Sequence, residues 1–215
     1  MDRFTFPIIG VHGGGTSLVS SLCISLGVSM GDTFMGPVKG YDTWEDVDFV
    51  RINMRAIHLA GGKWSRPPAL EKIYELEDNE GLLRDIQALV KSKTQGNWKW
   101  GWKDPRNCLT IQLYHAYLTS PHYIFVKRPR AAVVRSMLRR GGREGNAYWE
   151  AFYDEQWGRI TEFRYRLDAA QLEVQYDNLV NKDTCMDTLV ELAHWVRSKR
   201  PQQEAERAMR LVKFR

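Results

Sequence analysis

The fold of this chain is decided by one stretch, Gly10-Val11-His12-Gly13-Gly14-Gly15-Thr16-Ser17. Residues 5–11, which lead into it, form an apolar run of the kind that favours a β-strand. After it, Leu18, Leu22 and Leu26 recur at the spacing of one helix face. The pattern predicts a strand, a glycine turn and a helix, in which the glycines let the backbone turn sharply and approach a ligand closely.

A turn of this kind is suited to bind a phosphate-like anion. Successive backbone N–H groups point into the turn, and the start of the helix adds partial positive charge. The hydroxyls of Thr16 and Ser17 are further donors. Gly10 and Gly15 match the nucleotide-binding pattern G-x-x-x-x-G-K-[ST], but Thr16 replaces its lysine, which disfavours a kinase or ATPase. A glycine turn that binds nothing is the alternative for this segment taken alone.

Helices and strands alternate along the rest of the chain, and the 215 residues suffice for one globular domain. Apolar spacing predicts helices over residues 44–59, 82–90, 133–138, 147–167 and 186–196, and strands over 98–102, 123–127 and 172–175. The glycines and prolines of residues 61–68 predict a loop. Alternation of this kind favours a parallel α/β sheet covered by helices on both faces, with ligands at the carboxyl ends of its strands.

The net charge of +5 lies at the C-terminus. Residues 197–215 hold seven Lys or Arg against Glu204 and Glu206, a surplus of five, so residues 1–196 are neutral overall and no nucleic-acid partner is expected. We expect a main domain over residues 1–200 and a basic C-terminal helix or tail over 201–215. The amphipathic pattern of residues 201–215 suits binding to a membrane surface, an anionic polymer or a partner chain. The favoured interpretation is a terminal helix exposed to solvent.

The N-terminus and the hydropathy predict a cytoplasmic protein. The chain opens with Met1-Asp2-Arg3 and lacks the apolar leader of a secreted protein, and none of its apolar runs approaches the roughly 18 residues of a membrane span. We therefore expect no integral membrane segment. No feature of the sequence specifies an oligomeric state.

Four separated segments, in this order, resemble the sulfotransferases that use 3′-phosphoadenosine 5′-phosphosulfate (PAPS), especially short bacterial and viral-type members. They are the glycine loop from His12 to Leu18, the segment Trp102-Lys103-Asp104-Pro105-Arg106, the segment Phe125-Val126-Lys127-Arg128-Pro129 followed by Ser136, and Val174-Gln175-Tyr176-Asp177-Asn178-Leu179. The resemblance implies a parallel sheet related to that of the P-loop nucleotide kinases, which agrees with the alternation of helices and strands. It also implies transfer of a sulfuryl group from PAPS to an acceptor hydroxyl or amine.

The resemblance assigns roles toward the donor. It implies that the 5′-phosphosulfate is held by the loop, namely Gly13, Gly14, Gly15, Thr16 and Ser17, with Arg106 close by. It implies that the 3′-phosphate is held by the pair Lys127 and Arg128 together with Ser136, and leaves open which of the pair is the main contact. A phosphate dianion is best met by a cation and a hydroxyl, so this assignment is physically sensible. Since the sulfate is already activated in the donor, no metal and no redox cofactor are expected.

One departure from the family concerns the catalytic groups. Gly13 stands where relatives usually have Lys or Arg, so His12, Lys103 and Arg106 are the candidates for a replacement cation, and Lys103 is preferred for its permanent charge. Residues 40–46 resemble the family stretch that carries an acid, which makes Glu45 the first candidate for the catalytic base. Glu45 as a mere helix N-terminal acid is the alternative. Asp46 and His58 are reserves.

The acceptor is expected to be a small molecule or a glycan. Eight tryptophans, among them Trp44, Trp64 and the cluster Trp98, Trp100 and Trp102, are available to line a sugar or aromatic site, although more than half are expected in the core. Two other functions stay open at this point. They are a P-loop-type small-molecule kinase and a catalytically inactive homologue that binds PAPS or its product, 3′-phosphoadenosine 5′-phosphate (PAP).

Overall fold

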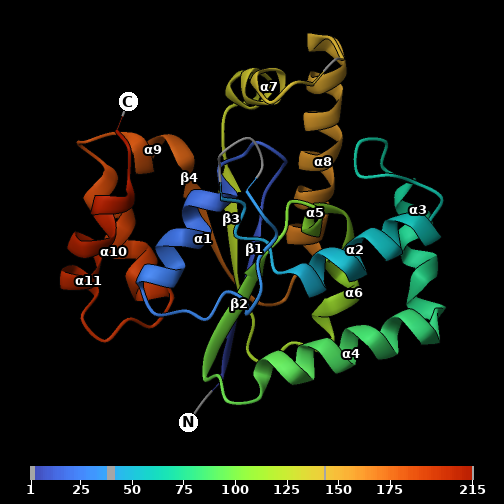
Figure 1. Ribbon diagram of the computed structural model, residues 1–215, viewed down its shortest axis with the longest axis horizontal. Coiled ribbons are helices and arrows are strands. Elements are labelled where there is room, and N and C mark those ends of the chain that lie inside the picture. Colours follow the sequence, from blue (N-terminus) through green and yellow to red (C-terminus); the bar gives the residue numbers. More distant parts are fainter. Residues whose placement is uncertain (1–2, 38–41, 143, 215) are drawn as a thin grey trace.

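The computed structural model describes residues 3–37, 42–142 and 144–214 of the chain. Within these ranges four parallel strands form one sheet in the spatial order β2-β1-β3-β4 (Figure 1). The strands are β1 Phe4–Ile9, β2 Lys99–Lys103, β3 His122–Lys127 and β4 Ala170–Gln175. Each agrees with a strand predicted from the sequence. The expectation of a single-domain parallel α/β fold is therefore confirmed.

Helices connect the strands and cover the sheet. Between β1 and β2 lie α1 Thr16–Ser25, α2 Val47–Leu59, α3 Leu70–Tyr74, the 3-10 helix η1 Glu75–Asp78 and α4 Glu80–Thr94. Between β2 and β3 lie α5 Asn107–Thr110 and α6 Gln112–His115, and between β3 and β4 lie α7 Arg130–Arg139 and α8 Asn146–Arg166. The chain ends with α9 Tyr176–Val180, α10 Cys185–Trp195, α11 Pro201–Ala208 and the 3-10 helix η2 Met209–Leu211.

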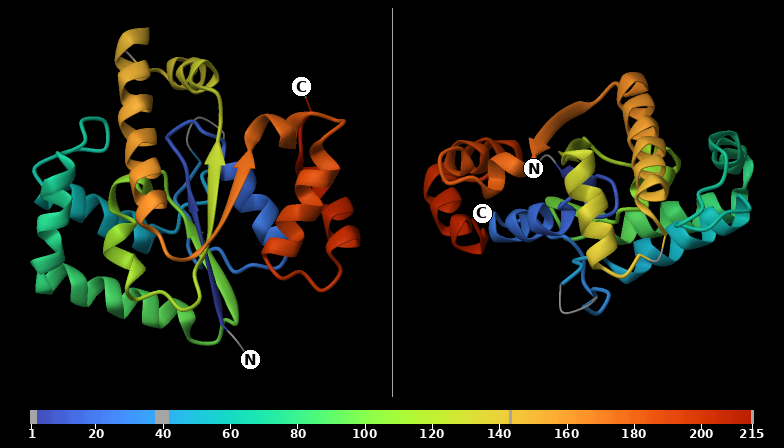
Figure 2. Two further views of the ribbon diagram at one scale, coloured as in Figure 1. Left: turned by 180° about the vertical axis from the view of Figure 1, so that it is seen from behind. Right: turned by 90° about the horizontal axis from the view of Figure 1, so that it is seen from above.

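Alternating side chains of the strands build two separate cores. On β3, Ile124 and Val126 face one side, where they pack with α1, α10 and α11. Tyr123 and Phe125 face the other side and pack with α2, α4 and α8. The views from behind and from above show the two groups of helices on opposite faces of the sheet (Figure 2). Because both of their faces are buried, the central strands β1 and β3 are mostly apolar, as in other parallel sheets, whereas the edge strand β4 alternates apolar and polar residues.

The start of α2 differs from the sequence prediction, which placed the helix at residue 44. The side chain of Asp46 accepts the backbone N–H of Asp48 at 2.9 Å, so Asp46 caps the helix and α2 begins at Val47. Two positions on this helix depart from the usual burial of apolar and exposure of polar side chains. Met54 is 38% exposed, whereas Asn53 is fully buried. A polar network beneath α2, described below, explains why an asparagine faces inward.

The order of the strands places the ligand-binding edge beside β1. The chain passes from β1 to β2 on one side and then to β3 on the other, so the connections leave the carboxyl end of β1 in opposite directions. Ligands of open parallel sheets bind at such a point. The glycine loop leaves β1 there, Asp104 follows β2 and Arg128 follows β3. In Figure 1, α7 and part of α8 extend beyond this edge of the sheet.

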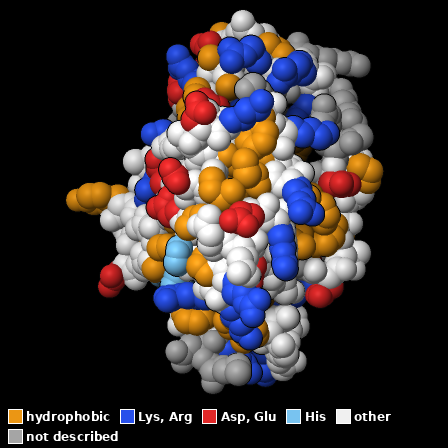
Figure 3. All heavy atoms as spheres, turned by 90° about the vertical axis from the view of Figure 1, so that its left-hand side faces the viewer, with side chains coloured by type: hydrophobic (Ala, Val, Ile, Leu, Met, Phe, Trp, Pro, Cys, Tyr) orange, Lys and Arg blue, Asp and Glu red, His pale blue; other side chains and the backbone are white. Residues whose placement is uncertain are grey.

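The C-terminal helix uses its apolar face inside the fold. Ala205 and Ala208 are fully buried and Val212 is nearly so, in the core that α1 and α10 also line. The basic residues, such as Arg207 and Arg210, are exposed. Figure 3 shows Lys and Arg on this side of the molecule interspersed with acidic and apolar side chains. The domain boundary at residue 200 stays a prediction. Among the described residues, no helix has the length and apolarity to cross a membrane.

Candidate active site

The glycine loop adopts a conformation that requires its glycines. Gly13 and Gly15 have φ angles of 78° and 94°, in the left-handed region that favours glycine. The N–H of Gly14 donates to the carbonyl of Val11 at 2.9 Å, which closes the turn. A Cβ atom at Gly15 would lie 2.1 Å from Cδ2 of Tyr176, so this ring packs directly on the loop. The loop therefore ends as the N-cap of α1, with the helix N-terminus available to an anion.

The first turn of α1 faces a cleft. Gly13, Gly15, Thr16 and Ser17 all line a cavity of about 510 Å³ at the carboxyl edge of the sheet. The hydroxyl of Ser17 donates to the carbonyl of Thr43 at 3.2 Å, which ties the helix to the segment before α2. Of the predicted stretch 40–46, Gly40 and Tyr41 lie outside the described residues. All residues of the predicted phosphate loop except Gly14 thus line this cleft.

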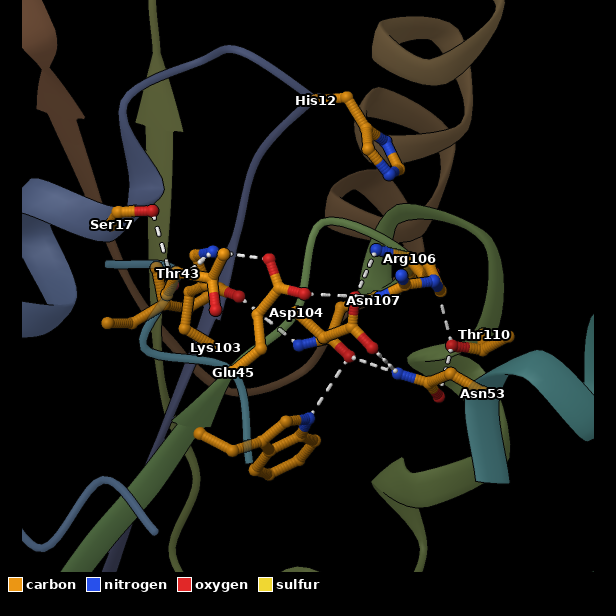
Figure 4. Close-up of polar contacts among 12 residues, drawn as sticks. His12, Ser17, Thr43, Glu45, Asn53, Lys103, Asp104, Arg106, Asn107 and Thr110 are labelled. Atoms are coloured by element: carbon orange, nitrogen blue, oxygen red, sulfur yellow. Dashed lines mark hydrogen bonds and ion pairs between the residues drawn. The ribbon is translucent and has the colours of Figure 1, made fainter. Parts of the chain in front are cut away.

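A buried ion pair crosses this cleft. Nζ of Lys103 donates to Oε1 of Glu45 at 2.8 Å and to the carbonyl of Thr43 at 2.7 Å, and Nη1 of Arg106 lies 3.4 Å from Oε2 of Glu45 (Figure 4). The Lys103 side chain is 2% exposed. Burial lowers the pKa of Lys103 below its ordinary value, and Glu45 opposes this shift. The structure therefore brings together the preferred cation and the preferred base of the sequence analysis.

A hydrogen-bonded network beneath the cleft fixes Arg106. Oδ1 of Asp104 accepts from the backbone N–H of Arg106 at 2.9 Å and from its Nη1 at 2.6 Å. Oδ2 of the same carboxylate accepts from Nδ2 of Asn53 at 2.9 Å. The side-chain oxygen Oδ1 of Asn53 in turn accepts from the hydroxyls of Thr110 and Tyr114, both at 2.8 Å. Since buried polar groups are costly unless paired, the network holds this end of the cleft in one geometry.

His12 lines the cleft as a neutral, packed imidazole. Its ring stacks on Trp64 with centroids 4.8 Å apart, and Nδ1 lies 3.3 Å from Nε2 of the Gln156 amide. Burial, followed by the charge of Arg106, lowers the pKa of His12 to about 3. The imidazole is therefore uncharged near neutral pH and supplies no positive charge there. This excludes His12 as a cation, so Lys103 and Arg106 remain of the three candidates in the sequence.

The residues predicted for the 3′-phosphate lie behind the loop, and none of the three lines the cleft itself. Arg128 is 4% exposed; its Nη1 donates to the carbonyl of Gly13 at 2.8 Å, and its guanidinium stacks on Tyr176 at 4.4 Å. A Cβ on Gly13 would lie 3.5 Å from Oγ of Ser136, so that hydroxyl is next to the loop. Lys127 instead places Nζ 5.5 Å above the ring of Trp157. Arg128 and Ser136 therefore lie together at the loop, and Lys127 does not.

Several cleft residues were not singled out from the sequence. The cleft is also lined by Trp64, which the sequence analysis named, and by Ser65, Met137, Arg140, Gly141, Gly142, Glu144 and Trp149, which it did not. Among the described residues, Arg140 has no ion-pair partner. Arg140 follows Ser136 by four residues, a helical spacing from which its orientation could have been inferred. Gln156 left no signal in the sequence, because a single amide within a long helix is indistinguishable from a surface residue.

The reserve bases lie elsewhere. Asp46 is fully buried and is held by Nζ of Lys93 at 2.8 Å and by two backbone N–H groups. His58 is exposed on α2 and is absent from the cleft lining. The helix N-terminal role considered for Glu45 thus belongs to Asp46, and Glu45 reaches the cleft instead.

Comparison with known proteins supports the fold. No protein-family model matches the chain, and no curated protein matches it. Among solved structures, a sulfotransferase from Mycobacterium tuberculosis H37Rv is 13% identical, with a TM-score of 0.52, over 98% of this chain and 71% of that chain. A sugar kinase from Janibacter sp. HTCC2649 is 11% identical, with a TM-score of 0.44, over 99% of both chains. At such low identity the likeness to the sulfotransferase establishes the fold alone.

Proposed function

We propose that this protein transfers a sulfuryl group from PAPS to an acceptor hydroxyl or amine. One observation carries the proposal: the glycine loop with the N-terminus of α1 and the pair of Lys103 and Glu45 line the same cleft. The loop supplies donors for an anion, and the pair supplies a cation and a carboxylate for the transfer step. The fold of the mycobacterial sulfotransferase is consistent with this reading.

The residues that line the cleft fit the 5′ end of the donor. The loop amides with Thr16 and Ser17 are assigned to the 5′-phosphosulfate. Nε of Arg106 is buried without a hydrogen-bond partner among the described residues, so it offers a donor that an anion in the cleft would satisfy. Arg128 and Ser136, beside Gly13, remain the assigned residues for the 3′-phosphate, with Lys127 as the outer candidate.

The transfer step requires a base and a cation. The acceptor oxygen attacks sulfur, the bond from sulfur to the bridging phosphate oxygen breaks, and its electron pair stays on the phosphate of the product PAP. The acceptor proton passes to the carboxylate of Glu45. Lys103 moves from Glu45 to the departing phosphate, where its charge offsets the charge that develops there. Because the two groups start as partners at 2.8 Å, this movement also frees Glu45 to take the proton.

Two features argue against the kinase alternative. Thr16 occupies the position of the lysine that follows the β- and γ-phosphates in P-loop enzymes. Asp104, the acid that directly follows β2, has both oxygens engaged by Arg106 and Asn53. A magnesium-binding acid needs a free oxygen for the ion. Binding of ATP with magnesium at this site would therefore require the buried network to rearrange.

Calorimetric titration tests the donor site. We expect the protein to bind PAP with a dissociation constant of about 1 μM to 100 μM, and AMP, which lacks the 3′-phosphate, at least about tenfold more weakly. Ser136→Ala should reduce the preference for PAP, and the exposed Ser92→Ala, on α4, is the control. A preference for ATP with magnesium over PAP would contradict the proposal and favour a kinase.

Transfer is tested separately with sulfur-labelled PAPS and a pool of glycans and small hydroxyl compounds. Label on an acceptor establishes the sulfotransferase and identifies its substrate class. Binding of PAP without transfer to any member of a broad pool would instead indicate the inactive homologue.

A further inference from the structure

A buried amide on α8 controls the environment of His12. Gln156 is fully buried, and its Oε1 accepts the backbone N–H of His12 at 3.2 Å across 144 residues of sequence. This contact fixes which way the amide points, because only its carbonyl oxygen can accept from an N–H group. The side chain of Gln156 therefore has one orientation relative to the glycine loop.

The fixed amide orientation determines the tautomer of His12. With Oε1 engaged by the backbone, Nε2 of Gln156 lies 3.3 Å from Nδ1 of the imidazole and donates to its lone pair. In the opposite tautomer Nδ1 would donate to Oε1, but that separation is 3.5 Å. That arrangement would also leave the buried amide N–H groups without an acceptor among the described residues. These contacts favour Nδ1 as an acceptor, with the ring proton on Nε2.

The ring itself is held in place and directed at the cleft. Trp64 stacks on one side at 4.8 Å with an interplanar angle of 25°, and Phe152 lies 5.8 Å away at 60°. In Figure 4 the imidazole extends from the glycine loop toward the cluster of Glu45, Lys103 and Arg106. A proton on Nε2 is therefore presented to whatever occupies the cleft.

We propose that Gln156 is a positioning residue that holds His12 in its Nε2–H tautomer, so that His12 donates a neutral hydrogen bond to an oxygen of the sulfuryl group during transfer. This inference rests on the proposed function. The sulfotransferases that this chain resembles usually have Lys or Arg at the position of Gly13. In this chain the N–H group of His12, next to Gly13, would take over the task of that cation. The imidazole keeps its proton throughout, and Glu45 remains the group that accepts the proton of the acceptor.

The electrostatics of the cleft support a neutral donor over an acid or a base. Burial and the charge of Arg106 lower the pKa of His12 to about 3, and Lys103 acts in the same direction, whereas Asp104 and the hydrogen bond that a charged imidazole would make to Gln156 oppose it. An imidazole with so low a pKa is a poor proton acceptor near neutral pH. Its N–H group, placed where charge redistributes in the transition state, still stabilises that state without any reorganisation.

Nitrogen-15 NMR of the histidine rings in the full chain, without ligand, tests the tautomer directly. The His12 signals, assigned by their loss in His12→Gln, should show a protonated Nε2 and an unprotonated Nδ1. Gln156→Glu should reverse the tautomer, because a carboxylate accepts from Nδ1–H, while Gln112→Glu, outside the cleft, is the matched control and should leave it unchanged. A protonated Nδ1 in the natural protein would overturn the inference, even if Gln156→Glu fails to fold.

Conservative replacement tests the role in transfer. Glutamine retains an N–H donor near the position of the imidazole Nε2, whereas leucine retains only the bulk. We expect His12→Leu to lower the rate constant of sulfuryl transfer by about 100-fold and His12→Gln by about tenfold or less, the scale found for single donors to a transition-state oxygen. Equal losses in the two variants would refute the donor role. If the unaltered protein shows no preference for PAP, the proposed function fails, whereas the tautomer measurement still stands on its own.

Discussion

Nζ of Lys103 lies 2.8 Å from Oε1 of Glu45, although 58 residues separate the two along the chain. Lys103 is the last residue of β2 and Glu45 precedes the cap of α2, so the pair closes the cleft between a strand end and the segment that follows α1. A charge buried to this degree is tolerated only with a partner. Substitution of either residue would therefore leave the other charge without this partner.

Lys103→Ala should slow sulfuryl transfer more than it weakens donor binding. In the proposed transfer its charge acts mainly on the departing phosphate, so we expect the rate constant to fall by about 100- to 1,000-fold, while the dissociation constant for PAP changes by less than about tenfold. Single-turnover kinetics with labelled PAPS, beside calorimetry, measure the two effects separately. The exposed Lys91→Ala, on α4, is the control. Unchanged turnover would remove Lys103 from this role.

Gly15→Ala should destabilise the protein and abolish nucleotide binding. The φ angle of 94° costs an alanine about 1–2 kcal/mol, and the new Cβ would lie 2.1 Å from Cδ2 of Tyr176. Gly96 has a φ of 79° but open space around it, so Gly96→Ala isolates the backbone cost. Denaturant unfolding of both variants should show a larger loss for Gly15→Ala. Equal losses of unfolding free energy in the two variants would mean that the Tyr176 ring moves away from the new Cβ at no cost.

Arg140→Gln should weaken the binding of anionic nucleotides. Arg140 lines the cleft and has no ion-pair partner among the described residues, so its charge is available to a ligand. We expect about a tenfold increase in the dissociation constant for PAP and a shallower dependence on salt. Arg139 is also exposed at the end of α7 but does not line the cleft, so Arg139→Gln controls for charge at the helix terminus. Similar effects of the two substitutions would indicate that the positive electrostatic field of the surface attracts the nucleotide, and not a direct contact with Arg140.

Lys93→Met should lower the free energy of unfolding by about 3 kcal/mol, since it leaves the buried Asp46 without its cation. Burial alone would lower the pKa of Lys93, but hydrogen bonds to Asp32 and Asp46 raise it above its ordinary value. A raised pKa in the folded state means that the stabilisation is complete below the pKa of the unfolded chain and is lost only as the pH rises through the folded value. Urea unfolding at pH 7 should therefore show the full loss, and Lys91→Met should show little change. A loss that grew toward alkaline pH would contradict this assignment.

Much of the fold follows from patterns local to the chain. Leu82, Ile86, Leu89 and Val90 recur on one face and are all buried on α4, as predicted. The glycine loop was also predictable from local sequence. A turn with left-handed residues such as Gly13 and Gly15 needs glycine whatever surrounds it. Strand, turn and helix are set by side-chain periodicity and backbone sterics, which act between near neighbours.

The sequence by itself determined the α/β alternation, the glycine loop and the residue types of the candidate site. Only the tertiary structure decided which of these groups meet. The pairing of Lys103 with Glu45 and that of Gln156 with His12 depend on the order β2-β1-β3-β4 and on helix packing, which bring distant segments together. The turning of Lys127 toward Trp157 and the neutrality of His12 likewise arise from neighbours far away in the chain. Charge, burial and hydrogen bonding depend on distances in space, and these distances are defined only when the chain is folded.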